Sequence, residues 1–184
     1  MSAIAELSAG AAVDRFVVGD CVHAGAMGRL YAVTSTDAAF PMLMKVPRLD
    51  RGVDAAQALL AFDTEALILP RMRGAHVPRF VAVGERESLP YLVMERVEGE
   101  SLDRRALPLD PAVIAEVGAA IADALHDIHG QDTIHLDLKP DNVVMRPDGS
   151  AVLIDFALAH HRELPDLLAE ERRHAAGSDR AYPE

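Results

Sequence analysis

The order of two hydrophobic patterns along the chain limits the folds that it can adopt. Short apolar runs bounded by turn residues come first and predict strands, in "FVVGDCVHAGAMGRLYAVTS", "FPMLMKVPRL", "VPRFVAVGER" and "LPYLVMERV". One segment between them, from Val53 to Leu69, has helical spacing instead, and Pro70 ends it. Strands that gather before the main helical segment favour an α+β fold with a boundary near Val97–Leu102.

A long amphipathic helix is predicted after that boundary. Asp110 suits the N-cap, Pro111 suits the first helical position and Gly130 suits the end. An apolar stripe at helical spacing is formed by Val113, Ile114, Val117, Ala120, Ile121, Leu125 and Ile128. One face of this helix therefore needs a core or a partner to cover it.

Composition and charge exclude several classes of protein. The 184 residues suffice for one domain or two small lobes with a buried core, and the net charge of −11 disfavours nucleic acid as a partner. The single cysteine, Cys21, excludes an internal disulfide framework and fits a reducing cytosol, so we expect a cytoplasmic location. Residues 1–15 lack the pattern of a secretion signal, and no apolar run reaches the roughly 18 residues that a membrane span needs.

The candidate functional segment is the stretch "HLDLKPDN", from His135 to Asn142. It gathers one imidazole, two carboxylates, one ammonium and one carboxamide, and such a cluster is costly to order unless it binds something. A short hairpin follows, with its turn at Pro147-Asp148-Gly149, and "LIDF" places Asp155 just beyond it.

"HLDLKPDNVVM" followed by "LIDFALA" resembles the catalytic segment of the eukaryotic-type Ser/Thr protein kinases. The resemblance extends from about Phe16 to Glu184. It is specific, because several separate motifs occur in the family's order. It implies a two-lobed protein-kinase-like α+β fold. We expect an N-terminal leader at 1–15, a β-rich N-lobe with one helix at 16–96, and an incomplete helical C-lobe at 97–184 that holds the catalytic loop and the activation segment.

The resemblance implies catalytic roles for the polar segment, since phosphoryl transfer depends on alignment and charge neutralisation. Asp137 would accept the proton of the substrate hydroxyl or orient that hydroxyl. Lys139 would neutralise charge on the transferred phosphate. Asn142 and Asp155 would offer the hard oxygen ligands that Mg²⁺ prefers.

The resemblance also explains a lysine inside an apolar strand. Lys45 in "MLMKV" would be expensive to bury unless it met anions. The nucleotide phosphates and Glu65 in "FDTEALIL" would supply them, and Glu65 would form the ion pair that positions Lys45. Leu69 and Val83 would stack with His135 and Phe156 to join the lobes.

The nucleotide site is expected between the glycine-rich segment "HAGAMGRLY" and the linker "YLVMERVEGESL". His23 replaces the family's first glycine, but Gly25 and Gly28 could still let backbone amides approach phosphates. Met94 would close the rear of the adenine site, Glu95 and Val97 would offer backbone groups to adenine, and Ser101 would reach the ribose. The residues expected to contact the nucleotide are Gly25, Gly28, Leu30, Leu43, Lys45, Met94, Glu95, Val97, Ser101 and Val144.

Departures from the family pattern carry further expectations. Leu136 replaces the arginine that grips a phosphorylated activation segment, so we expect little dependence on phosphorylation at Ser178 or Tyr182. Leu43 stands where the family has alanine over the adenine ring and could crowd the base. "GSDRAYPE" resembles the close of an activation segment, after which the family continues with more helices. A truncated chain of this kind predicts a second copy or a partner protein over the exposed helix stripe.

The expected function is Mg-ATP-dependent transfer of the γ-phosphate to Ser/Thr hydroxyls, with ATP and Mg²⁺ as cofactors and a protein as substrate. Two alternatives stay open. The first is a pseudokinase or nucleotide-binding regulatory module, which His23, Leu43 and Ala157 favour. The second is a small-molecule kinase of similar fold. No nucleic acid and no membrane is expected as a partner.

Overall fold

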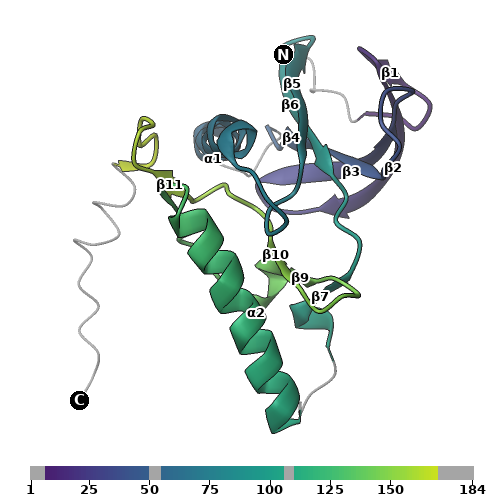
Figure 1. Ribbon diagram of the computed structural model, residues 1–184. Helices are drawn as coiled ribbons and strands as arrows, with labels where there is room; N and C mark the ends of the chain where they lie inside the picture. Colours follow the sequence, from purple (N-terminus) through teal and green to yellow (C-terminus); the bar gives the residue numbers. More distant parts are fainter. Residues whose placement is uncertain (1–6, 50–54, 106–109, 170–184) are drawn as a thin grey trace.

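The computed structural model describes residues 7–49, 55–105 and 110–169, and a β-rich part precedes a helical part in it (Figure 1). The helices are α1 (Ala55–Ile68) and α2 (Pro111–His129), with short 3₁₀ turns η1 (Leu69–Arg71), η2 (Leu102–Arg104) and η3 (Pro140–Asn142). The first strands are β1 (Ala12–Val13), β2 (Phe16–Ala24), β3 (Gly28–Thr34), β4 (Met42–Pro47), β5 (Phe80–Arg86) and β6 (Leu89–Glu95). The later strands are β7 (Glu100–Ser101), β8 (Thr133–Ile134), β9 (Val143–Met145), β10 (Ala151–Leu153) and β11 (His160–His161).

The first six strands form one antiparallel sheet in the order β1-β2-β3-β4-β6-β5, and α1 lies beside it (Figure 1). Side chains alternate between the two faces of each strand. In β4 the buried positions Met42, Met44 and Val46 belong to a core within the sheet part. Leu43 and Lys45 therefore project from the other face of β4, and both are candidate site residues.

A second core joins the sheet part to the helical part. It packs Phe62 and Leu69 from the α1–η1 segment against Ile128 of α2, Leu153 of β10 and Phe156. Burial of each such side chain is worth about 1.5–3 kcal/mol, so this core holds the two parts together. Leu69 and Phe156 belong to this same core, in agreement with the prediction that both join the lobes.

The prediction for Val83 is wrong. Val83 lies on β5, the edge strand of the sheet, and is 51% exposed, although its pairing partner Leu92 is fully buried. The register between β5 and β6 shifts between Phe80 and Ala82, and an edge strand has a neighbour on one side only. Val83 therefore remains outside the core that contains Leu69.

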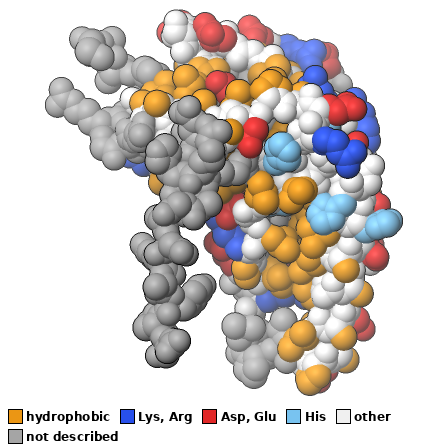
Figure 2. All heavy atoms as spheres, turned by 90° about the vertical axis from the view of Figure 1, so that its left-hand side faces the viewer, with side chains coloured by type: hydrophobic (Ala, Val, Ile, Leu, Met, Phe, Trp, Pro, Cys, Tyr) orange, Lys and Arg blue, Asp and Glu red, His pale blue; other side chains and the backbone are white. Residues whose placement is uncertain are grey.

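The long helix begins and ends as predicted. The Asp110 side chain accepts a hydrogen bond from the Ala112 amide at 2.8 Å, Pro111 is the first helical residue, and the Gly130 amide donates to the His126 carbonyl. The buried face includes Val117, Ala124 and Ile128, while Ile114 is 55% exposed. Figure 2 shows the molecule from the side on which α2 lies, and hydrophobic side chains gather on the surface of that side.

Several predictions concern residues outside the described ranges: the start of the leader at 1–6, Val53, Ser178, Tyr182 and the segment "GSDRAYPE". Among the helices that are described, none combines the length and the hydrophobicity that crossing a membrane would require.

Candidate active site

The hairpin of β9 and β10 brings Asn142 and Asp155 to the same end of one structural unit. Val143 pairs with Leu153, and the Ile154 amide donates to the Asn142 carbonyl at 3.0 Å. The predicted turn is present, with Gly149 at φ +87° and the Asp148 carboxylate accepting hydrogen bonds from Ser150. The strand pairing therefore brings Asn142 and Asp155, which are 13 positions apart in the sequence, close together.

Three side chains of the polar segment interact directly. The Lys139 ammonium lies 2.8 Å from Asp137 Oδ2, and this hydrogen bond raises the pKa of Lys139. The Asn142 amide nitrogen donates to both the carbonyl and the carboxylate of Asp137, each at 2.9 Å. Because its nitrogen is turned toward Asp137, Asn142 presents its carbonyl oxygen to any other ligand.

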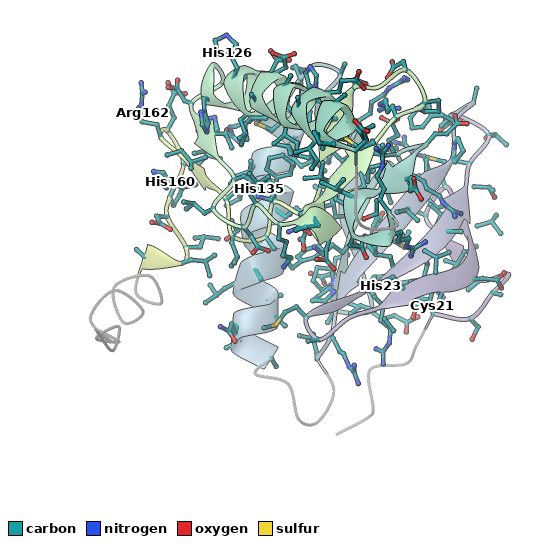
Figure 3. The ribbon with its side chains drawn as sticks, turned by 90° about the horizontal axis from the view of Figure 1, so that it is seen from below. Cys21, His23, His126, His135, His160 and Arg162 are labelled. Carbon is teal, nitrogen blue, oxygen red and sulfur yellow. The ribbon has the colours of Figure 1, made fainter. Side chains whose placement is uncertain are left out.

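His135 holds this segment against the strand that leads to Asp155. The ring is 1% exposed, lies inside the molecule (Figure 3), and packs on Phe156 with the ring centroids 5.0 Å apart. Nε2 donates to the Ile154 carbonyl at 3.0 Å, and Nδ1 accepts from the Asp137 amide at 3.3 Å. Since one nitrogen faces an acceptor and the other a donor, a proton on Nε2 fits both bonds.

Lys45 connects α1 to the end of the hairpin. Its ammonium lies 2.5 Å from Glu65 Oε2 and 2.8 Å from Asp155 Oδ1, so the predicted ion pair is present. The other Glu65 oxygen accepts from the Phe156 amide at 3.2 Å. Asp155 is at φ +64°, a left-handed conformation that aspartate tolerates better than most residues.

Neighbouring charges determine the direction in which the pKa values of Lys45 and Asp155 shift. Burial alone would lower the pKa of the Lys45 ammonium, but the carboxylates of Glu65 and Asp155 outweigh burial and raise it. Burial alone would raise the pKa of Asp155, but the Lys45 ammonium outweighs it and holds that pKa below its ordinary value. Asp155 is therefore a carboxylate near neutral pH.

Three of the apolar residues predicted to contact a nucleotide lie on strands β3, β4 and β9. Leu30 pairs with Lys45, and Leu43 lies two residues before Lys45, so all three share one face of the β3–β4 pair. Val144 is buried and pairs with Ser101. It points away from the core that contains its neighbours in β9, because side chains alternate along a strand.

The two glycines of the glycine-rich segment lie at the turn between β2 and β3, and the approach of its backbone amides to phosphates stays a prediction. The Gly25 amide donates to the Gly28 carbonyl at 2.9 Å and closes the turn. A Cβ at Gly28 would come 2.9 Å from the Val46 carbonyl oxygen, so glycine at that position allows β3 to approach β4. Figure 3 shows Cys21 and His23 on β2 beside this turn, remote from His135.

The linker after β6 contains residues that were expected to contact the nucleotide base. Met94 is buried, as a residue at the rear of a pocket should be. The Glu95 amide donates to the Arg79 carbonyl at 2.8 Å, so this amide is not available to adenine, whereas the contact expected of the Glu95 carbonyl stays a prediction. Val97 is half-buried outside any strand. The Ser101 hydroxyl donates to the Asp103 carboxylate and lies 3.5 Å from the Asp141 carbonyl.

Sequence reasoning missed the side chain of Glu95. Its carboxylate is 8% exposed and lies 2.9 Å from a guanidinium nitrogen of Arg146. The signal was a carboxylate at the end of the apolar run "LPYLVME", since a buried acid needs a cation. The partner could not be found the same way, because Arg146 is 51 residues further along the chain.

Comparisons with known proteins agree with this geometry. The family model described as "Protein kinase domain" matches residues 16–173. "Probable serine/threonine-protein kinase CPE1738" of Clostridium perfringens is 27% identical over 151 residues, covering 79% of this chain and 22% of that protein. "Serine/threonine-protein kinase PknH" of Mycobacterium tuberculosis is 30% identical over 138 residues, covering 73% of this chain and 22% of that protein.

A solved structure gives the same result for the fold. The kinase domain of PknI from M. tuberculosis superposes with a TM-score of 0.64 at 25% identity, covering 83% of this chain and 62% of that one. The chain spans about a quarter of the length of the curated relatives that it matches first.

Proposed function

The chain belongs to the protein kinase domain family, and on that premise we propose that it transfers the γ-phosphate of Mg-ATP to serine or threonine hydroxyls of a protein substrate. The observation that carries the proposal is the Lys45 ammonium held between Glu65 and Asp155, next to a segment in which Asp137 contacts both Lys139 and Asn142. We also propose that the chain consists of an N-lobe at 16–96 and a C-lobe at 97–184.

The donor set fits magnesium, which prefers carboxylate and carbonyl oxygens and keeps phosphate oxygens as further ligands. Asp155 is ionised, and Asn142 presents its carbonyl oxygen because its nitrogen bonds Asp137. Bound there, the ion would neutralise charge on the phosphates. These two residues would hold it from one end of the β9–β10 hairpin.

The remaining polar residues align the reactants. Asp137 would orient the substrate hydroxyl and accept its proton, and Lys139 would neutralise the phosphoryl oxygens as the bond to the leaving group breaks. Lys45 would bind the phosphates that remain on the nucleotide, and Glu65 would fix its position. Each role needs a side chain held in one geometry, which the hydrogen bonds described above supply.

The nucleotide base would lie between the face of β3 and β4, with Leu30 and Leu43, and Val144 on the opposite side. Met94 would limit the depth of the pocket. Val97 would offer backbone groups to the base, and the Ser101 hydroxyl would approach the ribose. The turn that contains Gly25 and Gly28 would cover the phosphates.

The test separates binding from transfer. In the parent chain, Mg-ATP at a hundred times its dissociation constant should add about 2.7 kcal/mol of stability in thermal unfolding. Asp137→Asn should keep that stabilisation and lose transfer of labelled phosphate to a protein substrate. Asp141→Asn is the matched control, because Asp141 is an exposed carboxylate of the same loop. An Asp137→Asn variant that turns over like the parent would exclude the role of Asp137.

A nucleotide-binding regulatory module is the second candidate, and Leu43 favours it because it projects from the nucleotide face of β4. Stabilisation by Mg-ATP with no transfer to any acceptor would support this candidate. Transfer to a small alcohol but to no protein would instead support a small-molecule kinase. A second copy or a partner protein that covers the apolar surface of α2 remains a prediction.

A further inference from the structure

Glu95 lies at the end of β6, where the chain leaves the sheet for the linker, and its buried carboxylate contacts two arginines from different parts of the fold. Oε1 accepts from the Arg146 guanidinium at 2.9 Å. Oε2 accepts from the Arg79 amide at 3.2 Å and lies 3.6 Å from Arg79 Nε. Arg79 immediately precedes β5 of the sheet, whereas Arg146 immediately follows β9 on the other side of the linker.

Both ends of the Glu95–Arg146 contact are attached to ordered elements. On one side, the Glu95 amide is bonded to the Arg79 carbonyl. On the other, the Arg146 amide donates to the Ser150 carbonyl at 2.8 Å, and the preceding residue, Met145, is part of the core. An ion pair between two such elements restricts their relative movement as well as stabilising each charge.

The two arginines differ in what they offer the carboxylate. The Arg146 side chain is 22% exposed and the Arg79 side chain is 66% exposed, so the Arg146 contact is the more desolvated one. Charge pairs gain strength as water is excluded, and exposed pairs contribute little. Arg79 also stacks on Phe40 at 5.0 Å, within its own part of the fold.

We propose that the Glu95–Arg146 ion pair is a positioning contact that sets the orientation of the N-lobe relative to the C-lobe. The linker between β6 and β7 would otherwise be the pivot of that motion. Because Leu43 and Lys45 lie on one side of this pivot and Asn142 and Asp155 near the other, the pair also sets how well the two halves of the nucleotide site match.

The main test does not depend on the proposed function. Spin labels are placed on the two lobes at Val17→Cys on β2 and Ala122→Cys on α2, both exposed positions, with Cys21→Ser in the background. The distribution of distances between the labels is measured by pulsed electron spin resonance. Arg146→Met should broaden it, and the matched control Arg79→Met, which removes the contact made within the N-lobe, should leave it unchanged.

Arg146→Met also leaves a buried carboxylate with weaker compensation, and the variant could unfold for that reason alone. The double variant Glu95→Met/Arg146→Met leaves no buried unpaired charge at this position, because the Arg79 side chain that also loses Glu95 is 66% exposed. It should therefore fold, yet it should show the broadened distribution. A parent-like distribution in the double variant, or equal broadening in Arg79→Met, would overturn the proposal.

A second readout rests on the proposed function. If the matching orientation falls to about a tenth of the population, the apparent dissociation constant for Mg-ATP rises about tenfold. This loss should appear in the double variant as a raised KM for ATP with a smaller change in kcat. Failure of the parent itself to bind Mg-ATP would count against the proposed function and would leave the spin-label result standing.

Discussion

Replacing Lys45 with methionine should cost much of the stability of this protein, independently of any effect on catalysis. The Glu65 side chain is 1% exposed and that of Lys45 is 15% exposed, so the pair is almost fully removed from water. Lys45→Met would leave the Glu65 carboxylate with the Phe156 amide, at 3.2 Å, as its described hydrogen-bond donor. Breaking a buried pair by removing one partner costs about 3–5 kcal/mol.

That cost is large against the total stability of about 5–15 kcal/mol that is typical of a domain. For a chain of this length it corresponds to a fall in Tm on the order of 10 °C. The double variant Lys45→Met/Glu65→Met removes both buried charges of the pair, and the Asp155 carboxylate that loses Lys45 is 41% exposed to water. Methionines of similar volume fill the same space. This variant should therefore regain most of the loss, since apolar replacement of a whole buried pair is often neutral.

The sign of the pH dependence provides a separate check. In the parent, burial would raise the pKa of Asp155, but the Lys45 ammonium outweighs it and holds that pKa below its ordinary value. Asp155 therefore contributes stability that is present above about pH 4 and is lost as the pH falls through the lowered pKa. Lys45→Met lacks this contribution, so the parent should lose more stability than Lys45→Met when the pH is lowered from about 7 to about 3. The double variant also lacks Lys45 and should resemble Lys45→Met in this respect.

Urea unfolding of the parent and of both variants at the two pH values measures these quantities by linear extrapolation. The reasoning is refuted if Lys45→Met is as stable as the parent at the higher pH. It is equally refuted if the double variant is less stable than Lys45→Met, because the unpaired carboxylate would then not be the cause.

Three further predictions follow from local geometry. Leu136 is 51% exposed at φ +59°, a conformation that costs leucine about 1–2 kcal/mol, so Leu136→Asn should stabilise the fold by about 1 kcal/mol in urea unfolding, and a loss would contradict this. Burial and the hydrogen bond to Asp14 raise the pKa of Tyr91 from 10.0 to about 12. Its contribution to stability should thus be present below pH 10 and be lost as the pH rises through 12, and Tyr91→Phe should remove the late step from the phenolate absorbance titration. Leu43→Ala should tighten Mg-ATP binding about tenfold by calorimetry if leucine crowds the base, and unchanged affinity would show that it does not.

The sequence predicted those parts of the fold that depend on local signals. The caps of α2 at Asp110 and Gly130 and the turn of the β9–β10 hairpin follow from side chains that bond their own neighbourhood. The Lys45–Glu65 pair was predictable for a different reason, since a lysine within an apolar strand must meet an anion. The resemblance to the kinase family identified Glu65 as that anion.

What the sequence did not predict depends on the arrangement of distant segments. The exposure of Val83 follows from its place on an edge strand and from a register shift, neither of which a hydrophobic pattern records. The use of the Gly25 amide within its own turn depends on the pairing of β2 with β3. Arg146 follows β9 at the start of a hairpin turn, where the sequence pattern predicts exposed polar side chains. Its contact with Glu95 is therefore visible only in the folded structure.

The ladder between β9 and β10 has a consequence for how relatives of this protein can be recognised. Asn142 and Asp155 are held together by strand pairing at one end of the hairpin, while the turn at 147–150 lies at the other. Lengthening a loop adds little closure cost, so extra residues after Asp148 would leave both groups in place. A search that demands a fixed interval between the two residues would miss such chains, whereas one that allows the interval to vary and requires the flanking apolar strands would retain them.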